Sequence, residues 1–215
     1  MERLLTKSAP INALNNYINT PLHLAIQNGH TSIVGLLLEK GALIEVGDRF
    51  ATPLCLAVHL GHTSTAKLLL EKGALIDARN NCNFTPLHIA AQNGQTSIVE
   101  LLLEKGAPIE AINHNNDTPL YYAVWGGHTS LVELLLRKGA STQVISFNND
   151  TPLHVAARSG HTSTVELLLE KGALVEARNT DNDTPLDIAA RGGFTGIVQL
   201  FKNKSAEPVT HGNNA

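Results

Sequence analysis

The sequence predicts an all-α solenoid of helix pairs with projecting hairpin tips, and three periodic markers carry this prediction. The tripeptide Thr-Pro-Leu recurs at intervals of 32 or 33 residues, a glycine follows nine residues after each threonine, and a second glycine closes five of the six units. Such regular recurrence indicates repeats that bury their apolar sides against their neighbours. The threonines that open the units are Thr20, Thr52, Thr85, Thr118, Thr151 and Thr184.

Each unit contains the start and stop signals of two short helices. Threonine is a favoured N-cap and proline fits the first helical position, so the first helix of the first unit starts at Thr20 and ends at Gly29. Thr31 is expected to cap a second helix over residues 33–40, which Gly41 ends. The polar residues that follow suit a turn or a β-hairpin tip. Four tips place an asparagine where a positive φ is expected, namely Asn83, Asn116, Asn149 and Asn182.

The markers predict one solenoid domain over residues 15–204, preceded by a truncated unit and followed by a tail. Residues 1–14 match the end of a full unit, so we expect an N-terminal half-repeat there. Residues 205–215 lack the pattern, which predicts a flexible C-terminal tail. In the last unit Lys202 replaces an apolar leucine, as the polar outer face of a capping repeat requires.

The third unit carries T-P-L-H from Thr85 and L-L-L-E-K-G-A from Leu101 within a 33-residue period, and it resembles an ankyrin repeat. The resemblance covers about 200 of the 215 residues. It implies stacked helix pairs with tips at right angles to the helices, and a concave face that binds another protein. It also implies that the motif histidine joins neighbouring units. Cys55, Tyr121 and Asp187 replace this histidine in three units, so those junctions should differ.

Composition excludes several other classes of protein. The 16 basic residues do not exceed the 19 acidic ones, which argues against a nucleic-acid partner. No apolar run approaches the ~18 residues of a membrane span, so we expect no membrane insertion. The first residues lack the apolar segment of a signal peptide, and two cysteines are too few for a disulfide scaffold. These features predict a monomer with an intracellular, cytoplasmic location.

The chain offers little that suggests chemistry. Seven of the ten histidines occupy repeat positions, which favours structural roles over metal binding or catalysis. Asp181 and Asp183 are more readily explained as a solvated turn than as an acid–base pair. Cys55 and Cys82 lie in adjacent units without a recognisable base, and a disulfide between them is not favoured. We therefore expect no catalytic residue, no cofactor and no metal, and hence a protein that is not an enzyme.

The aromatic residues gather in the tips and first helices, on the side that the resemblance makes concave. The position two residues before the inter-helix glycine varies from glutamine to Trp125, while an alanine earlier in the same helix is constant. Tryptophan, tyrosine and arginine dominate interface energetics, so this variation predicts a partner-binding surface. An architectural spacer, or a fragment of a longer ankyrin array in a multidomain protein, remains the alternative because the units are so alike. The predicted surface comprises Phe84, Gln92, Asn93, Asp117, Tyr121, Trp125, Phe147, Asp150 and Arg158.

Overall fold

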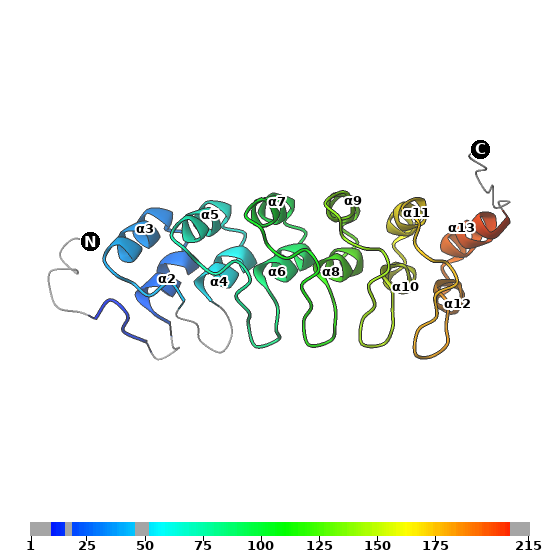
Figure 1. Ribbon diagram of the computed structural model, residues 1–215, viewed down its shortest axis with the longest axis horizontal. Helices are drawn as coiled ribbons and strands as arrows, with labels where there is room; N and C mark the ends of the chain where they lie inside the picture. The colour runs from blue at the N-terminus through cyan, green and yellow to red at the C-terminus, as the bar shows by residue number, and fades with distance from the viewer. Residues whose placement is uncertain (1–9, 16–18, 46–51, 207–215) are drawn as a thin grey trace, which may run out of the picture. The chain divides into compact units, whose positions relative to one another are not determined.

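The structure is a computed structural model that describes residues 10–15, 19–45 and 52–206 (Figure 1). It divides into two compact units, Met1–His114 (unit 1) and Asn115–Ala215 (unit 2), each with three helix pairs in its described part. Unit 1 contains α2 (Pro21–Gln27), α3 (Thr31–Glu39), α4 (Pro53–His59), α5 (Thr63–Glu71), α6 (Pro86–Gln92) and α7 (Thr96–Glu104). Unit 2 contains α8 (Pro119–Trp125), α9 (Thr129–Arg137), α10 (Pro152–Ser159), α11 (Thr162–Glu170), α12 (Pro185–Arg191) and α13 (Thr195–Ala206). The predicted all-α class is confirmed.

The even-numbered helices, which are the first of each pair, begin as predicted. Each follows a threonine in extended conformation and has proline in its first turn. The threonine side chain accepts a backbone N–H three residues later; in α4, Thr52 Oγ1 accepts the Cys55 N–H at 3.3 Å. This bond satisfies one of the amide groups that a helix N-terminus leaves without an intrahelical partner, which is why a seven-residue helix starts at a defined residue.

The second helices start differently from the prediction. Thr31 is not the cap of α3 but its first residue, and the preceding His30 makes no side-chain capping bond. The Thr31 hydroxyl lies 2.7 Å from that of Thr65 in the next repeat, and Thr129 pairs in the same way with Thr164 at 2.8 Å. Thr65 and Thr164 are buried, so their hydroxyls need a partner inside the protein. The threonines therefore join neighbouring repeats.

Within each unit, like helices pack on like. In unit 1, α4 lies between α2 and α6, and α5 lies between α3 and α7; in unit 2, α10 and α11 hold the corresponding places. The interior consists of small and branched aliphatic side chains, such as Leu54 and Leu69 in unit 1 and Leu120 and Leu153 in unit 2. These side chains come from the apolar side of each short helix, so no single repeat could bury them alone.

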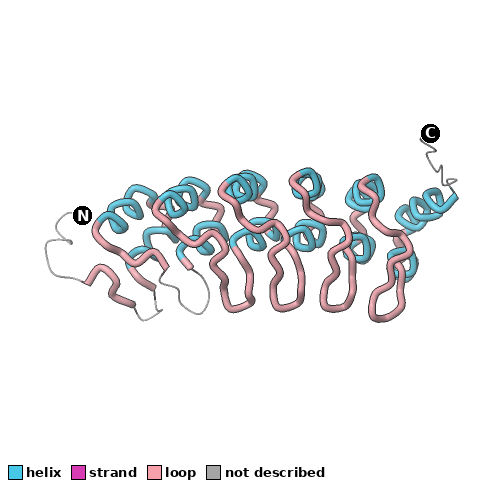
Figure 2. Tube along the Cα trace, in the orientation of Figure 1, coloured by secondary structure: helices cyan, strands magenta, loops and turns pink. Residues whose placement is uncertain are grey.

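Loops project from the first-helix side of each unit (Figure 2). The described loops contain turns and no strand, which decides between the two predicted forms of the tip. The four predicted asparagines do adopt positive φ, between 56° and 64°. In unit 2 neighbouring tips are tied by backbone bonds, from Phe147 N–H to Asn115 C=O at 2.7 Å and from Thr180 N–H to Asn148 C=O at 3.0 Å.

The glycine between the two helices of a pair is covered by a side chain from the next repeat. Gly127 has φ +68°, and a Cβ built on it would lie 2.7 Å from the His161 ring. The Phe194 ring covers Gly160 in the same way, and His62 lies over Gly29. These glycines therefore meet two demands at once, a left-handed backbone and close approach of the neighbouring repeat.

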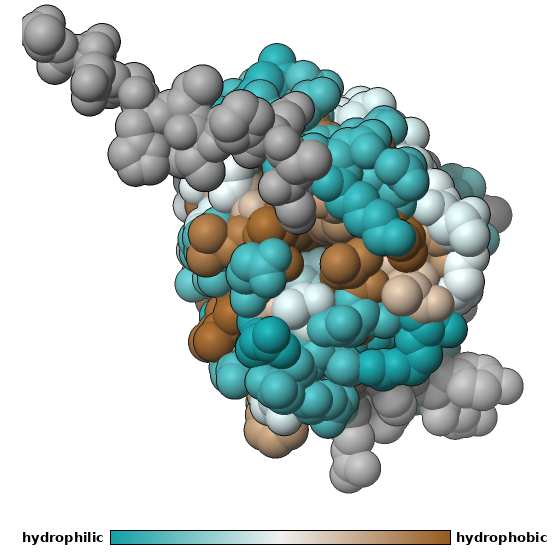
Figure 3. Space-filling model, turned by 90° about the vertical axis from the view of Figure 1, so that its right-hand side faces the viewer, coloured by the Kyte–Doolittle hydropathy of each residue, from teal (hydrophilic) through white to brown (hydrophobic). Residues whose placement is uncertain are grey.

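The two ends of the chain are described in part. Most of the predicted half-repeat, residues 1–9, lies outside the described residues, although the Asn12 side chain accepts the Leu43 N–H at 2.9 Å. Helix α13 continues to Ala206, which includes the first two residues of the predicted tail, and residues 207–215 lie outside the description. Lys202 is exposed as expected, and Phe201 is buried. The face at this end is nevertheless mixed, with hydrophobic groups (brown) among hydrophilic ones (teal) in Figure 3.

Two glycines of unit 1 should respond in opposite directions to added side chains. Gly106 has φ +90°, where a β-branched residue is strained, so Gly106→Val should lower the free energy of unfolding by about 1–2 kcal/mol or more. Gly35 lies inside α3, where a Cβ would meet only Leu68 at 3.6 Å. Gly35→Ala should therefore raise the free energy of unfolding by about 0.5–1 kcal/mol. Urea unfolding followed by circular dichroism checks both. Equal stability of wild type and Gly106→Val would contradict the left-handed turn.

Candidate binding surface

The nine predicted surface residues fall into both units. Gln92 is the last residue of α6 in unit 1, Asn93 is its C-cap and Phe84 lies in the preceding loop. The other six lie in unit 2, on α8, on α10 and in the loops before them, so each unit's group is described separately. Those six are Asp117, Tyr121, Trp125, Phe147, Asp150 and Arg158.

In unit 1 these side chains take part in internal contacts. The Asn93 side-chain amide donates to the His59 carbonyl at 3.3 Å, which links α6 to α4. Phe84 is half-buried, and its ring centroid lies 5.4 Å from that of His88. Gln92 is half-buried as well. This group is therefore partly occupied in holding the repeats together.

Unit 2 exposes large apolar side chains at the predicted positions. Trp125 is 54% exposed and Phe147 is 73% exposed, although tryptophan and phenylalanine usually bury most of their surface. Ile145, which the sequence analysis did not single out, is 50% exposed in the same tip as Phe147. Tyr122 is buried, as expected from its correspondence to a core leucine, and its hydroxyl donates to Asp117 at 3.0 Å. The exposed apolar groups near the predicted positions therefore belong to α8 and to the tip before α10.

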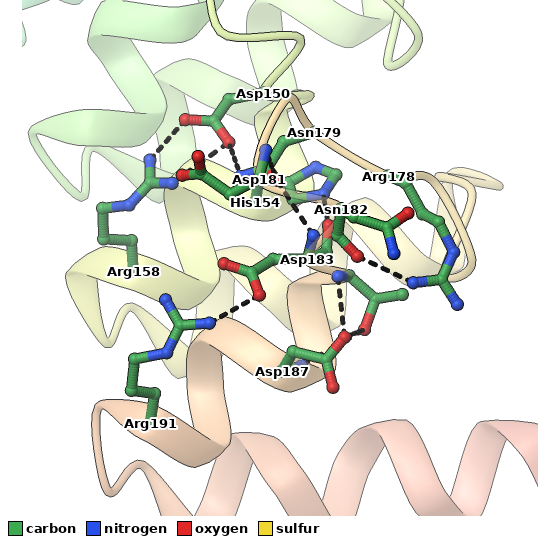
Figure 4. Close-up of polar contacts among 11 residues, drawn as sticks. Asp150, His154, Arg158, Arg178, Asn179, Asp181, Asn182, Asp183, Asp187 and Arg191 are labelled. Atoms are coloured by element: carbon green, nitrogen blue, oxygen red, sulfur yellow. Dashed lines mark hydrogen bonds and ion pairs between the residues drawn. The ribbon is translucent and has the colours of Figure 1, made fainter.

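Asp150 and Arg158 form a fixed pair rather than two separate surface groups (Figure 4). The Arg158 guanidinium donates two hydrogen bonds to the carboxylate, at 2.5 and 3.1 Å, and Asn179 adds a third at 2.9 Å. Asp150 is only 4% exposed, whereas the Arg158 side chain is 48% exposed. Burial by itself would raise the pKa of Asp150, but the bonds from Arg158 and Asn179 outweigh it and hold that pKa below its ordinary value. Asp150 thus orients Arg158, and only the arginine reaches solvent.

Asp117 occupies the equivalent place in the fourth repeat and is also buried. Tyr121 is half-buried beside it, and its pKa is raised by burial and by the charges of Asp117 and Asp150. The two aspartates are therefore buried, and each accepts hydrogen bonds from a neighbouring side chain, Asp117 from Tyr122 and Asp150 from Arg158. Of the six predicted residues in unit 2, those available for contact are Trp125, Phe147, Arg158 and the exposed part of Tyr121.

The sequence prediction missed Arg191, which repeats the Arg158 arrangement in the sixth repeat (Figure 4). Its guanidinium donates to Asp183 at 2.5 Å, and its side chain is 67% exposed. The signal was present in the sequence, because Asp183 and Arg191 are eight residues apart, as are Asp150 and Arg158. Asp183 is therefore one half of an ion pair, and not merely part of the solvated turn that the sequence suggested.

All three motif histidines, His23, His88 and His154, cap the start of their own helix, and His154 also joins the next repeat. Thr151 N–H donates to His154 Nδ1 at 3.1 Å, and the Thr151 hydroxyl lies 2.8 Å from the same nitrogen. Because Nδ1 accepts, the proton lies on Nε2, which donates to the Asp183 carbonyl of the next repeat at 3.1 Å. In the sixth repeat the Asp187 carboxylate accepts from the Thr184 N–H and hydroxyl at 2.9 and 2.7 Å. Aspartate thus replaces histidine as the cap of this helix.

The described residues were also compared with the requirements of a metal site, a membrane span and a disulfide. No three His, Cys, Asp or Glu side chains within them lie close enough together to hold a metal ion. None of the helices in those ranges has the length and apolar character needed to cross a membrane. Cys55 and Cys82 are both free thiols, and burial raises the pKa of the Cys55 thiol.

Helix pairs closed by Thr-Pro caps and glycine turns define a class of repeat protein, and comparison with known families gives the same result. The sequence matches the family described as ankyrin repeats (3 copies) over residues 1–80, 74–146 and 140–211, and the chain belongs to this family. It is also 40% identical over 47 residues to a protein of Rickettsia bellii (strain RML369-C) that is named for ankyrin repeats. That match covers 22% of this chain and about a fifth of the relative's length. Ankyrin repeats are generally non-catalytic modules of protein–protein interaction.

The stability that the His154 cap contributes and the stability that the Asp187 cap contributes should be lost over different ranges of pH. Burial lowers the pKa of His154, so the folded protein disfavours its protonation, and the stability it contributes is present above the unfolded pKa of ~6.5 and lost as pH falls below it. Bonds from the Thr184 backbone and side chain lower the pKa of Asp187, so its contribution is lost only as pH falls below ~3.9.

Substitution separates these effects. The difference in free energy of unfolding between wild type and His154→Asn should be about 1–2 kcal/mol at pH 7.5 and should shrink toward pH 5. The difference for Asp187→Asn should stay constant over that range and shrink only near pH 4. Urea unfolding followed by Trp125 fluorescence measures both, because the one tryptophan lies in the same unit. A difference for His154→Asn that does not change with pH would contradict the lowered pKa of His154 in the folded protein.

Proposed function

We propose that the chain is a non-catalytic recognition module that binds another protein through the first helices and tips of unit 2. The exposure of Trp125 is the observation that carries this proposal. The equivalent positions in the other repeats hold polar residues, Gln27, His59, Gln92, Arg158 and Arg191, so the frame of the repeat does not require an apolar residue there.

The surroundings of Trp125 favour a preorganised contact. His161 Nε2 donates to the Trp125 carbonyl at 3.1 Å, which joins the end of α8 to the start of α11, the second helix of the next pair. Arg158 is held by Asp150 before any partner arrives. Side chains that are already ordered lose less conformational entropy on binding, so more of the contact energy appears as affinity.

The intracellular, monomeric character expected from the sequence belongs to the same proposal. Two free thiols are consistent with a reducing compartment. An architectural role is the second candidate, favoured by the hydroxyl pairs and glycine contacts that recur between repeats regardless of the surface residues. The two roles differ in what Trp125 does, since a spacer has no use for an exposed tryptophan.

The proposal predicts that Trp125→Ala abolishes partner capture with little loss of folding stability. Truncating a central aromatic anchor often costs about 2 kcal/mol or more of binding free energy, roughly a thirtyfold loss of affinity. Leu174→Ala is the matched control, because Leu174 is 60% exposed in the same unit but lies outside the predicted surface. Pull-down from lysate with quantitative mass spectrometry compares wild type and both variants.

A partner captured by wild type and Leu174→Ala but not by Trp125→Ala would support the recognition role. The purified partner should then shift Trp125 emission to the blue and protect it from acrylamide. Capture that does not depend on Trp125, or the absence of any captured protein, would favour the architectural role.

A further inference from the structure

We propose that unit 2 binds a segment of its partner in polyproline II conformation, with an apolar residue on Trp125 and carboxylates on Arg158 and Arg191. This inference rests on the proposed function and names the chemistry of the partner. The three residues are called the first-helix row below. They hold equivalent positions, 33 residues apart, at the ends of three successive first helices, α8, α10 and α12.

The spacing of the row fits a partner segment in polyproline II conformation. Helix α10 packs against both α8 and α12, and the axes of packed helices lie about 8–10 Å apart. A polyproline II helix has three residues per turn and rises about 3.1 Å per residue, so residues i, i+3 and i+6 share one face at intervals of about 9 Å. In a β-strand alternate residues share a face, so residues three apart would point in opposite directions. One face of a polyproline II segment therefore matches the row.

The N–H donors that the two arginines leave unused indicate the residues on that face. Helices α8 and α10 contain no acidic residue, and Asp187 in α12 lies in the first turn, away from Arg191 at the end of the helix. Two of the five N–H donors of Arg158 bind Asp150, and its side chain remains 48% exposed. Arg191 gives one bond to Asp183 and is 67% exposed. The outer edges of both guanidiniums can therefore donate hydrogen bonds to further carboxylates, in an orientation that the aspartates beneath have already fixed.

Trp125 selects the first position of the segment. Its exposed ring stands at the end of the row, on a helix without charge, and flat aromatic surfaces bind proline and aliphatic side chains of polyproline II ligands. The expected sequence is proline or leucine, then two residues of any kind, an acidic residue, two further residues and a second acidic residue. Proline at the intervening positions should favour binding, because it preorganises the segment.

Asp181 provides a test in which removing a charge should strengthen binding of the segment rather than weaken it. It is exposed in the loop before α12, and Arg158, Asp181, Asp183 and Arg191 line one open hollow with Ile188 beneath. A carboxylate that approaches the two arginines would meet repulsion from Asp181. Removing that charge should strengthen binding of an acidic segment, whereas a purely structural role of the cluster predicts no gain.

The probe is a synthetic ten-residue peptide without tryptophan, with leucine at position 1, glutamate at positions 4 and 7, and proline and serine elsewhere. Titration of the full chain, followed by Trp125 fluorescence, should show saturable binding that weakens as salt rises. A peptide of the same composition with glutamate at positions 3 and 5, and one with lysine at positions 4 and 7, should each bind at least about tenfold more weakly.

Variants locate the contact. Arg191→Gln should weaken binding of the probe about fivefold or more, and Asp181→Asn should strengthen it about twofold. Arg178→Gln should leave it unchanged, because Arg178 binds the Asn182 carbonyl within the loop and lies outside the row. Circular dichroism confirms that each variant is folded.

No saturable binding, equal binding of the peptide with displaced glutamates, tighter binding of the lysine peptide, or no effect of Arg191→Gln would each overturn the inference. If the peptides fail while capture of a protein still depends on Trp125, the proposed function stands and the partner has different chemistry. If capture does not depend on Trp125 either, both proposals fall.

Discussion

A residue with positive φ separates the two helices of every pair in the described part of the chain, and the rest of the structure depends on the tight turn it permits. The chain reverses there within about three residues, so the second helix lies directly against the first. Only then do the leucines of both helices face the same neighbouring repeat. Each first helix has seven or eight residues, too short to be stable by itself in water, and this packing is what holds it.

The sequence predicted those features whose causes are local. A threonine hydroxyl that binds an amide three residues later, a proline in the first turn and an asparagine at positive φ each act within one turn of chain, and all were found where the pattern put them. The start of the second helices was mispredicted because the Thr31 hydroxyl is used by Thr65, 34 residues away. Nothing in the local sequence of Thr31 distinguishes a capping hydroxyl from one that joins two repeats.

At the candidate surface, too, the sequence predicted local features but not those that depend on distant residues. The exposure of Trp125 followed from comparing equivalent positions, since five polar residues mark the position as solvated. The burial of Asp150 did not follow, because it depends on Arg158 from the next helix and on Asn179 from the next tip. Taking a carboxylate out of water is costly unless several donors meet it, and here the donors come from two different segments. A list of polar residues in one tip could not reveal which of them lies inside.

Several inter-helix glycines are covered by a side chain of the next repeat, so the space above the turn of one repeat depends on a residue of its neighbour. Gly127 meets the ring of His161 and Gly160 meets that of Phe194, whereas nothing lies within 4 Å of a Cβ built on Gly193 in the sixth repeat. A duplicated repeat would carry both the side chain that covers the glycine of the preceding repeat and a glycine that the following repeat can cover. The array can therefore lengthen or shorten by whole units through genetic duplication and loss without a new solution for any turn. Unequal recombination between such similar units would therefore yield folded products, and the candidate surface could change in length while the scaffold stayed the same.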